Sequence, residues 1–257
     1  MAFETFVVAY AAILGLIVGS YLNVVIYRLP RRLSTVAPRS RCPGCGTPIG
    51  ARDNLPVVSW LLLGGRCRSC KAPISPRYPL IEAATAALFV ACVLAFGTTV
   101  AALAAALFAA LLVALAAIDV EHFMLPDRLT LPGIAAGLAL SPFLPFGGFR
   151  AALLGAALGG GILLAISGAW LLLRGEEGMG LGDVKMLAMI GAFLGWKGVV
   201  VALFSASLLG AAVGVVLLGR SRAGLKTKLP FGAFLSLGGL FALFAGARLV
   251  DLYLRLL

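Results

Sequence analysis

Long apolar runs occupy most of this chain and restrict its fold more than any other feature. They cover about residues 3–27, 78–96, 98–118, 129–147, 150–173, 184–195, 198–218 and 229–250. Only 12% of the 257 residues are charged, against roughly 25% in a soluble domain. Because backbone polar groups in hydrocarbon must be satisfied internally, such runs must be helices. We therefore predict an all-α integral membrane protein with about eight transmembrane helices.

The shortest runs are the least regular. Residues 184–195 are too few to span a bilayer upright, which predicts a tilted or re-entrant segment. The first run lacks the basic residues that open a signal peptide, so we expect it to remain as the first helix. These runs predict three regions: a first transmembrane helix at 1–27, a cytoplasmic loop domain at 28–77, and a membrane catalytic domain with seven further helices at 78–257.

Lys and Arg are distributed unevenly over the connecting segments. With the N-terminus outside, 17 of the 21 basic side chains lie in cytoplasmic segments and four outside; residues 28–77 alone hold ten. This asymmetry predicts the orientation by the positive-inside rule. The formal charge of +11 is then explained by topology and anionic lipid headgroups, so no nucleic-acid partner is needed.

Two C-x-x-C pairs lie in the polar block 28–77, namely Cys42 with Cys45 and Cys67 with Cys70. Two such pairs can place four thiolates around Zn²⁺, and a reducing cytoplasm disfavours disulfides. A block this small and polar needs a stabilising metal, so we predict a structural zinc site. A redox dithiol or a metal-free loop are the alternatives. Cys92 lies in an apolar run and is predicted to be an ordinary buried residue.

Two aspartates directly adjoin apolar runs. Asp119 ends one run, and Asp183 closes the glycine-rich segment GMGLGD at 178–183. A carboxylate so close to hydrocarbon is costly and marks a functional site by default. The glycines are expected to allow unusual backbone angles and close approach to a ligand. Two carboxylates brought together in a partly dry site share a proton, as in aspartic proteases.

Other polar residues near these aspartates have simpler interpretations. Asp127 follows a proline and precedes an apolar run, which predicts a helix N-cap. Glu121 is interpreted as a solvated loop charge and His122 as a loop residue. Glu82, one turn into the second span, is interpreted as an intramembrane hydrogen-bonding group.

Taken in order, these motifs resemble those of the bacterial prepilin peptidases, the type IV leader peptidases of the GxGD aspartic protease group. The similar segments are 19–30, 78–82, 119–127, 180–185 and 230–235, together with the two C-x-x-C pairs. The GxGD sequence alone is a weak signal, whereas the ordered set is specific. The similarity runs from about residue 15 to 240.

The resemblance implies that Asp119 and Asp183 are the catalytic pair, supported by Gly180, Gly182, Lys185 and Asp127, and that Cys42, Cys45, Cys67 and Cys70 bind zinc. The implied substrates are type 4 prepilins and pseudopilins of type IV pilus and type II secretion systems. Their basic leader would be cut at the cytoplasmic face of the inner membrane.

The resemblance also implies methylation of the new N-terminal amine with S-adenosylmethionine. No Rossmann-type glycine fingerprint is present to bind that cofactor. Asn23 and Glu82 are the only candidate residues for this second activity, and its cofactor-binding residues are otherwise unassigned.

Two alternatives of other classes remain. A transporter with intramembrane carboxylates would place its acids mid-span and show internal repeats. Here the acids lie at span ends and we find no repeat. A non-enzymatic zinc-bearing secretion scaffold would tolerate loss of Asp119 or Asp183.

We also expect Glu121, Glu176 and Glu177 to attract the basic leader.

Overall fold

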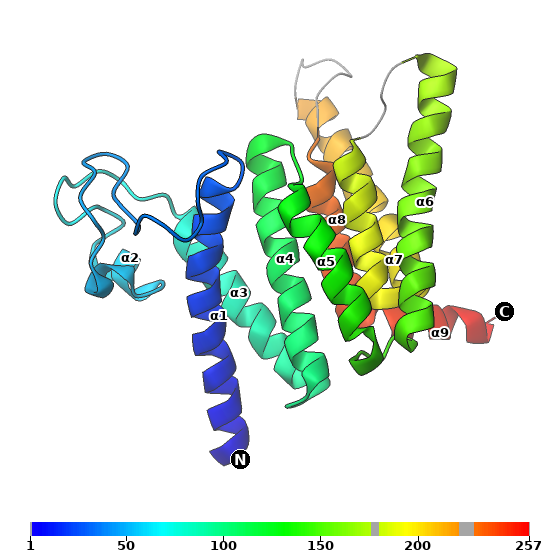
Figure 1. Ribbon diagram of the computed structural model, residues 1–257, viewed down its shortest axis with the longest axis horizontal. Coiled ribbons are helices and arrows are strands. Elements are labelled where there is room, and N and C mark those ends of the chain that lie inside the picture. The colour runs from blue at the N-terminus through cyan, green and yellow to red at the C-terminus, as the bar shows by residue number, and fades with distance from the viewer. Residues whose placement is uncertain (1, 176–179, 221–228, 257) are drawn as a thin grey trace. The chain divides into compact units, whose positions relative to one another are not determined.

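The computed structural model describes residues 2–175, 180–220 and 229–256, and most of its apolar runs form helices (Figure 1). The helices are α1 (Ala2–Arg28), α2 (Val58–Leu62), α3 (Arg77–Phe96), α4 (Val100–His122), α5 (Asp127–Leu140), α6 (Gly148–Arg174), α7 (Leu181–Arg220), α8 (Phe231–Phe241) and α9 (Ala247–Leu256). Within these residues there are no strands, only two isolated bridges in the loop between α1 and α3.

Five helices are long and apolar enough to cross a membrane: α1, α3, α4, α6 and α7. The shorter apolar segment Phe231–Gly246 comprises α8 and the π-helical turn that follows it. These helices confirm the predicted all-α membrane fold. The chain is a multi-pass membrane protein.

Two predicted runs form a single kinked element. Residues 184–195 and 198–218 are the two arms of α7, which bends at Gly195, where φ is 68° and ψ is −175°. A side chain at this left-handed φ would be strained, and its Cβ would lie 3.0 Å from the carbonyl oxygen of Phe146. Residues 184–195 are too few for an upright span because the kink at Gly195 ends the first arm of the helix there.

Several helix ends differ from the expectation. The fourth apolar run was expected to reach 147, but α5 ends at Leu140 because Ser141 and Pro142 begin a 3₁₀ turn. The last run was expected to reach 250, but α8 ends at Phe241. The separate helix α9 follows the π turn, and its Asp251 accepts a hydrogen bond from Lys197 Nζ at 2.6 Å.

The chain divides into two compact units, residues 1–114 and 115–257, and the division falls within α4. In the first unit, α1 and α3 run antiparallel and touch through two glycines. A Cβ on Gly15 would lie 2.6 Å from Ala86 Cα, and one on Gly19 would lie 2.7 Å from Glu82 Cα. This is the small-residue spacing that lets membrane helices approach closely.

In the second unit, α7 packs against α5, α6 and α8. Glycines again set the closest contact: a Cβ on Gly155 would meet the carbonyl oxygen of Gly191 at 2.5 Å, and one on Gly159 would meet that of Leu187 at 2.5 Å. The backbones of α6 and α7 are therefore in direct contact. This packing fixes the start of α7, where Asp183 lies.

Candidate functional site

Asp119 lies in the last turn of α4 and is buried, with 6% of its surface exposed. Its carboxylate oxygen Oδ2 accepts a hydrogen bond from the backbone N–H of Ala233, with N and O 3.0 Å apart. Ala233 is in the first turn of α8, and its N–H is shared with the carbonyl oxygen of the N-cap residue Pro230 at 3.2 Å. Asp119 therefore caps α8 with a side chain from a distant helix.

Asp183 lies in the first turn of α7 and is partly buried. Its N–H donates to the carbonyl oxygen of Gly180 at 3.1 Å, which closes the turn before the helix. The carboxylates of Asp119 and Asp183 interact electrostatically. The structure thus brings together the two aspartates that the sequence singled out, at the ends of two apolar helices.

Leu125 packs beside this aspartate pair and requires two glycines. A Cβ on Gly232 would lie 2.9 Å from both methyl carbons of Leu125 and 3.0 Å from Asp119 Oδ2. A Cβ on Gly182 would lie 3.0 Å from Leu125 Cβ. These two glycines therefore permit close packing around the carboxylates.

The expectation of unusual backbone angles in the glycine-rich segment is wrong for the residues that the structure describes. Neither Gly180 nor Gly182 has a positive φ. Gly182 is instead needed because it has no side chain, which leaves room for Leu125 to pack against it. Gly178 lies outside the described residues.

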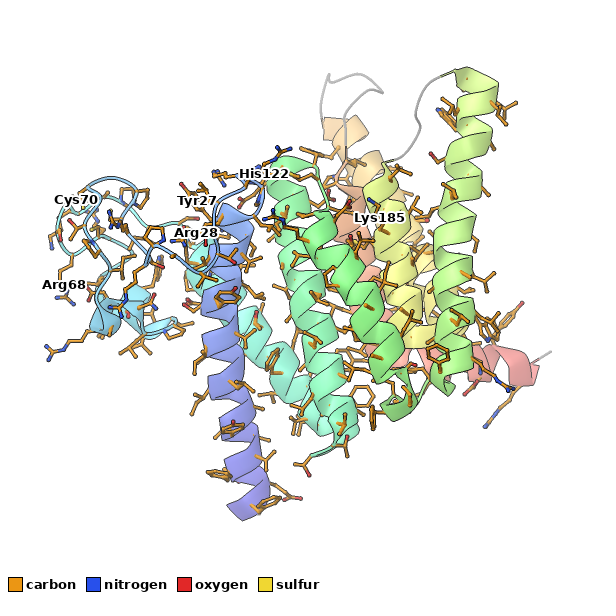
Figure 2. All side chains as sticks on the ribbon, viewed as in Figure 1. Tyr27, Arg28, Arg68, Cys70, His122 and Lys185 are labelled. Carbon is orange, nitrogen blue, oxygen red and sulfur yellow. The ribbon has the colours of Figure 1, made fainter. Side chains whose placement is uncertain are left out.

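The sequence predicted that Asp127 is the N-cap of α5, and this prediction is wrong. Asp127 is the first residue of that helix, Pro126 is the N-cap, and no side chain caps the helix. Asp127 Oδ1 instead accepts a hydrogen bond from Lys185 Nζ at 2.6 Å. The ion pair connects the start of α5 to the start of α7, and Figure 2 shows Lys185 at that end of α7.

The helix α4 continues through His122, so His122 and Glu121 belong to its last turn and not to a loop. The helix ends after His122, because the next residue, Phe123, has a positive φ of 52° that does not fit an α-helix. Glu121 is exposed, and its Oε2 lies 3.9 Å from His122 Nε2. Glu176 and Glu177, also expected to attract a basic leader, lie outside the described residues.

Cys42, Cys45, Cys67 and Cys70 form a compact cluster in the loop between α1 and α3. All four sulfur atoms lie within 4.8 Å of one another, and Sγ of Cys42 and of Cys70 are 3.7 Å apart. A tetrahedral zinc site with Zn–S bonds of about 2.3 Å places its sulfurs about 3.8 Å apart. The cluster therefore fits a tetrahedral thiolate-bound metal. Figure 2 shows Cys70 on this loop, and Cys92 is buried in α3 away from the cluster.

The two cysteine pairs are held by the same local fold, repeated after 25 residues. In the first, Cys42 N–H donates to the Thr47 carbonyl and Ile49 N–H to that of Ser40; in the second, Cys67 donates to Ala72 and Ile74 to Gly65. The sequences RCPGCGTPI and RCRSCKAPI carry this repeat. We expected no internal repeat in the chain, and this expectation is wrong for these two nine-residue segments.

Two further contacts shape the cysteine loop. Hydrogen bonding to the side chain and backbone of Thr47 lowers the pKa of the Cys45 thiol to about 6, which favours the thiolate that a metal needs. Arg68 donates to both carboxylate oxygens of Asp53, with Nη2 to Oδ1 at 2.7 Å and Nε to Oδ2 at 2.9 Å. This contact lowers the pKa of Asp53.

Sequence reasoning missed Ala233 and Leu125. Segment 230–235 was recognised as similar to a family segment, but no role was given to it. A backbone N–H leaves no trace in residue identity, so the contact with Asp119 could not be seen. Gly232, a glycine in an apolar run, was the one available signal of a close approach.

The fold and the site define a class: a multi-pass membrane protein with a carboxylate pair at helix ends and a four-thiol loop. The model of the type IV leader peptidase family matches residues 106–215, and that of the bacterial peptidase A24 N-terminal domain matches residues 13–96. The first match includes Asp119 and Asp183, and the second includes all four clustered cysteines.

Three relatives illustrate the similarity, each called a prepilin leader peptidase/N-methyltransferase. That of Burkholderia pseudomallei (strain 1026b) is 43% identical over 263 residues, covering 93% of this chain and 85% of the relative. That of Pseudomonas aeruginosa is 40% identical over 266 residues, covering 95% and 92%. That of Myxococcus xanthus is 46% identical over 218 residues, covering 84% and 65%. No solved structure matches the chain.

This chain belongs to the type IV leader peptidase family.

Proposed function

We propose that this protein is an enzyme that removes the basic leader peptide from type 4 prepilins and pseudopilins and then methylates the new N-terminal amine. Relatives that match over most of both chains carry both activities in their names. The observation that carries the proposal here is the pairing of Asp119 and Asp183 at helix ends in the second unit. Neither a transporter nor a non-enzymatic scaffold would explain both the paired aspartates and the membership of a peptidase family.

In the proposed cleavage, one carboxylate of the Asp119–Asp183 pair takes a proton from water while the other donates a proton to the scissile carbonyl. The Ala233 N–H fixes the position of the Asp119 carboxylate. Leu125 fills the space beside both helix ends, which limits water around the pair. Gly180, Gly182, Lys185 and Asp127 support this arrangement.

We propose an orientation in the bacterial inner membrane with the N-terminus outside and the aspartate pair and cysteine loop in the cytoplasm. The excess of basic residues in the proposed cytoplasmic segments supports it. A prepilin would approach with its basic leader in the cytoplasm and its apolar helix in the bilayer. The scissile bond would then lie at the cytoplasmic boundary of the membrane, where we propose that Asp119 and Asp183 lie.

We propose that the metal of the cysteine loop is zinc. The mutual distances of the four sulfurs fit a tetrahedral site, and two C-x-x-C pairs are a usual donor set for structural zinc. Residues 28–77 would then form a zinc-binding domain, between a first helix at 1–27 and a catalytic membrane domain at 78–257. S-adenosylmethionine would supply the methyl group for the second reaction.

The proposal is tested by incubating the purified protein with a prepilin, with and without S-adenosylmethionine, and weighing the product by mass spectrometry. We expect a product lacking the leader in both reactions, heavier by one methyl group when the methyl donor is present. An unprocessed prepilin would refute the peptidase assignment, and a processed but unmethylated product would refute the methyl transfer alone.

A further inference from the structure

Asn23, in α1, carries a buried acceptor without a partner. Only 2% of its surface is exposed, and its Oδ1 has no hydrogen-bond partner among the described residues. Its Nδ2 donates to the carbonyl oxygen of Gly19 at 3.3 Å and to that of Tyr78 at 3.1 Å. Because both partners are carbonyls, the amide cannot be reversed without placing oxygen against oxygen. The unpaired atom is therefore an acceptor.

Glu82, in α3, lies one helical turn along the same face from Tyr78. It is 7% exposed, and its Oε2 accepts a hydrogen bond from the N–H of Val57 at 2.7 Å. The hydroxyl of Ser20 also lies near this carboxylate. Two oxygens with about four lone pairs retain acceptor capacity beyond these two contacts. Within the part of the chain that the structure describes, Glu82 makes no ion pair.

The cysteine loop is strained where it meets Glu82. Val57 has φ of 61° and ψ of −50°, an outlying conformation for a β-branched residue. Strain of this kind persists only where surrounding contacts impose it, and it gathers at functional sites. Here the imposed contact points the Val57 N–H at a buried carboxylate. The cysteine loop is thereby attached to α3 at Glu82.

The chemistry of these groups specifies a ligand. Asn23 Oδ1 and the Glu82 carboxylate only accept hydrogen bonds, so a partner must donate, and a positive charge would offset the buried carboxylate. The backbones of α1 and α3 touch at Gly19, one turn from Asn23. This closeness favours a compact ammonium group over a planar guanidinium.

We propose that Asn23 Oδ1 and the Glu82 carboxylate, here called the acceptor pair, bind the α-ammonium group of the trimmed pilin. The inference rests on the proposed function, because leader removal creates that amine. An α-amino group has a pKa of roughly 7.7–8.0 and is mostly protonated in the cytoplasm. The acceptor pair lies in the first unit, and Asp119 and Asp183 lie in the second. The two reactions therefore use different residues.

Binding of two peptides to the full-length protein in lipid nanodiscs tests this assignment. Both carry the N-terminal sequence of a trimmed pilin, one with a free α-amine and one with an acetylated amine. We expect the wild type to bind the free amine about tenfold more tightly, as a charge-assisted hydrogen bond warrants. Glu82→Gln should remove that preference, because it replaces an acceptor oxygen with a donor NH₂, while Gln Oε1 can still accept from Val57.

Thr85→Val is the matched control. Thr85 is fully buried one turn further along α3, and among the described residues its hydroxyl donates only to the Ile81 carbonyl of its own helix. This variant should keep the preference for the free amine. Glu82→Asp, which retains the charge, should recover part of the preference. Metal content of the cysteine loop reports whether each variant is folded.

Each contrary outcome is informative. A wild type that binds both peptides equally, or a folded Glu82→Gln that still prefers the free amine, would overturn the proposal. So would loss of metal in Glu82→Gln and also in Asn23→Ser, since the pair would then be a structural support. Failure of the proposed function is separate: a wild type that prefers the free amine but does not cleave prepilin would refute the peptidase assignment only.

Discussion

Asp119 joins parts of the chain that are 114 residues apart, since it ends α4 and accepts the N–H of Ala233 at the start of α8. The same carboxylate interacts electrostatically with Asp183 at the start of α7. Three helix ends therefore meet at one side chain. Small changes at its neighbours should affect cleavage more than stability.

Gly232→Ala tests how closely Asp119 is confined. The added methyl would lie 3.0 Å from Asp119 Oδ2 and 2.9 Å from the methyl carbons of Leu125, so both side chains must shift slightly. A displacement of about 1 Å costs up to roughly 100-fold in rate, and for the smaller shift here we expect prepilin cleavage to fall by about 10-fold. Gly161→Ala, in α6 with open space around it, is the control. Wild-type cleavage by Gly232→Ala would refute the confinement.

Asp127→Asn separates the ion pair from the catalytic pair. Asp127 and Lys185 are bonded at 2.6 Å, but their side chains are 56% and 30% exposed. Exposed pairs contribute about 1 kcal/mol or less, so the variant should lose less than about 1 kcal/mol of unfolding free energy and keep most of its cleavage activity. Thermal unfolding and prepilin cleavage together measure this. Loss of cleavage equal to that of Asp183→Asn would instead place Asp127 in the catalytic pair.

At the scale of the elements, glycines decide which helices touch. Gly155 and Gly159 in α6 face Gly191 and Leu187 in α7, and their missing side chains bring the two backbones together. The chain has 32 glycines, and their number alone does not say which pair of helices is in close contact. That pairing depends on tertiary structure and has no local signature.

Gly191→Ala tests this contact. Its Cβ would collide with the carbonyl oxygen of Gly155, so α6 and α7 must separate. Overpacking of this kind costs typically about 1–3 kcal/mol, and we expect a lower midpoint of thermal unfolding in detergent. Gly168→Ala, whose Cβ would meet nothing within 4 Å, should unfold as the wild type does. Equal midpoints for the two variants would contradict the packing.

The cysteine loop is an element whose stability should depend on pH. Because the fold lowers the pKa of Cys45 from 9.0 to about 6, its thiolate stabilises the folded loop fully above about pH 9, and this contribution is lost as the pH falls from about 9 to about 6. Protons then compete with the metal for the thiolates. We expect bound metal, measured by elemental analysis, to be retained at neutral pH and released progressively as the solution is acidified.

Two variants complete this test of the loop. Cys45→Ser should release metal already at neutral pH, whereas Cys92→Ala, buried in α3, should retain it. Metal that stays bound to Cys45→Ser would contradict the four-cysteine site.

For the molecule as a whole, the sequence predicted the class of fold, the clustering of four cysteines in one loop and the position of two aspartates at helix ends. These features were visible because a carboxylate or a thiol is conspicuous in a chain with 12% charged residues. It did not predict the end of α5 at Leu140, the joining of two runs in α7, or the partner of Asp127. Those features depend on backbone turns and on contacts between distant residues, which composition and periodicity do not encode.

The central claim is that Asp119 and Asp183 together cut the leader peptide. The most direct measurement is prepilin cleavage by purified wild type, Asp119→Asn and Asp183→Asn, each checked for bound metal at the cysteine loop. Loss of a general acid or base predicts a rate lower by about 10²- to 10⁴-fold in both variants, with metal retained. Cleavage at the wild-type rate by either folded variant would contradict the claim.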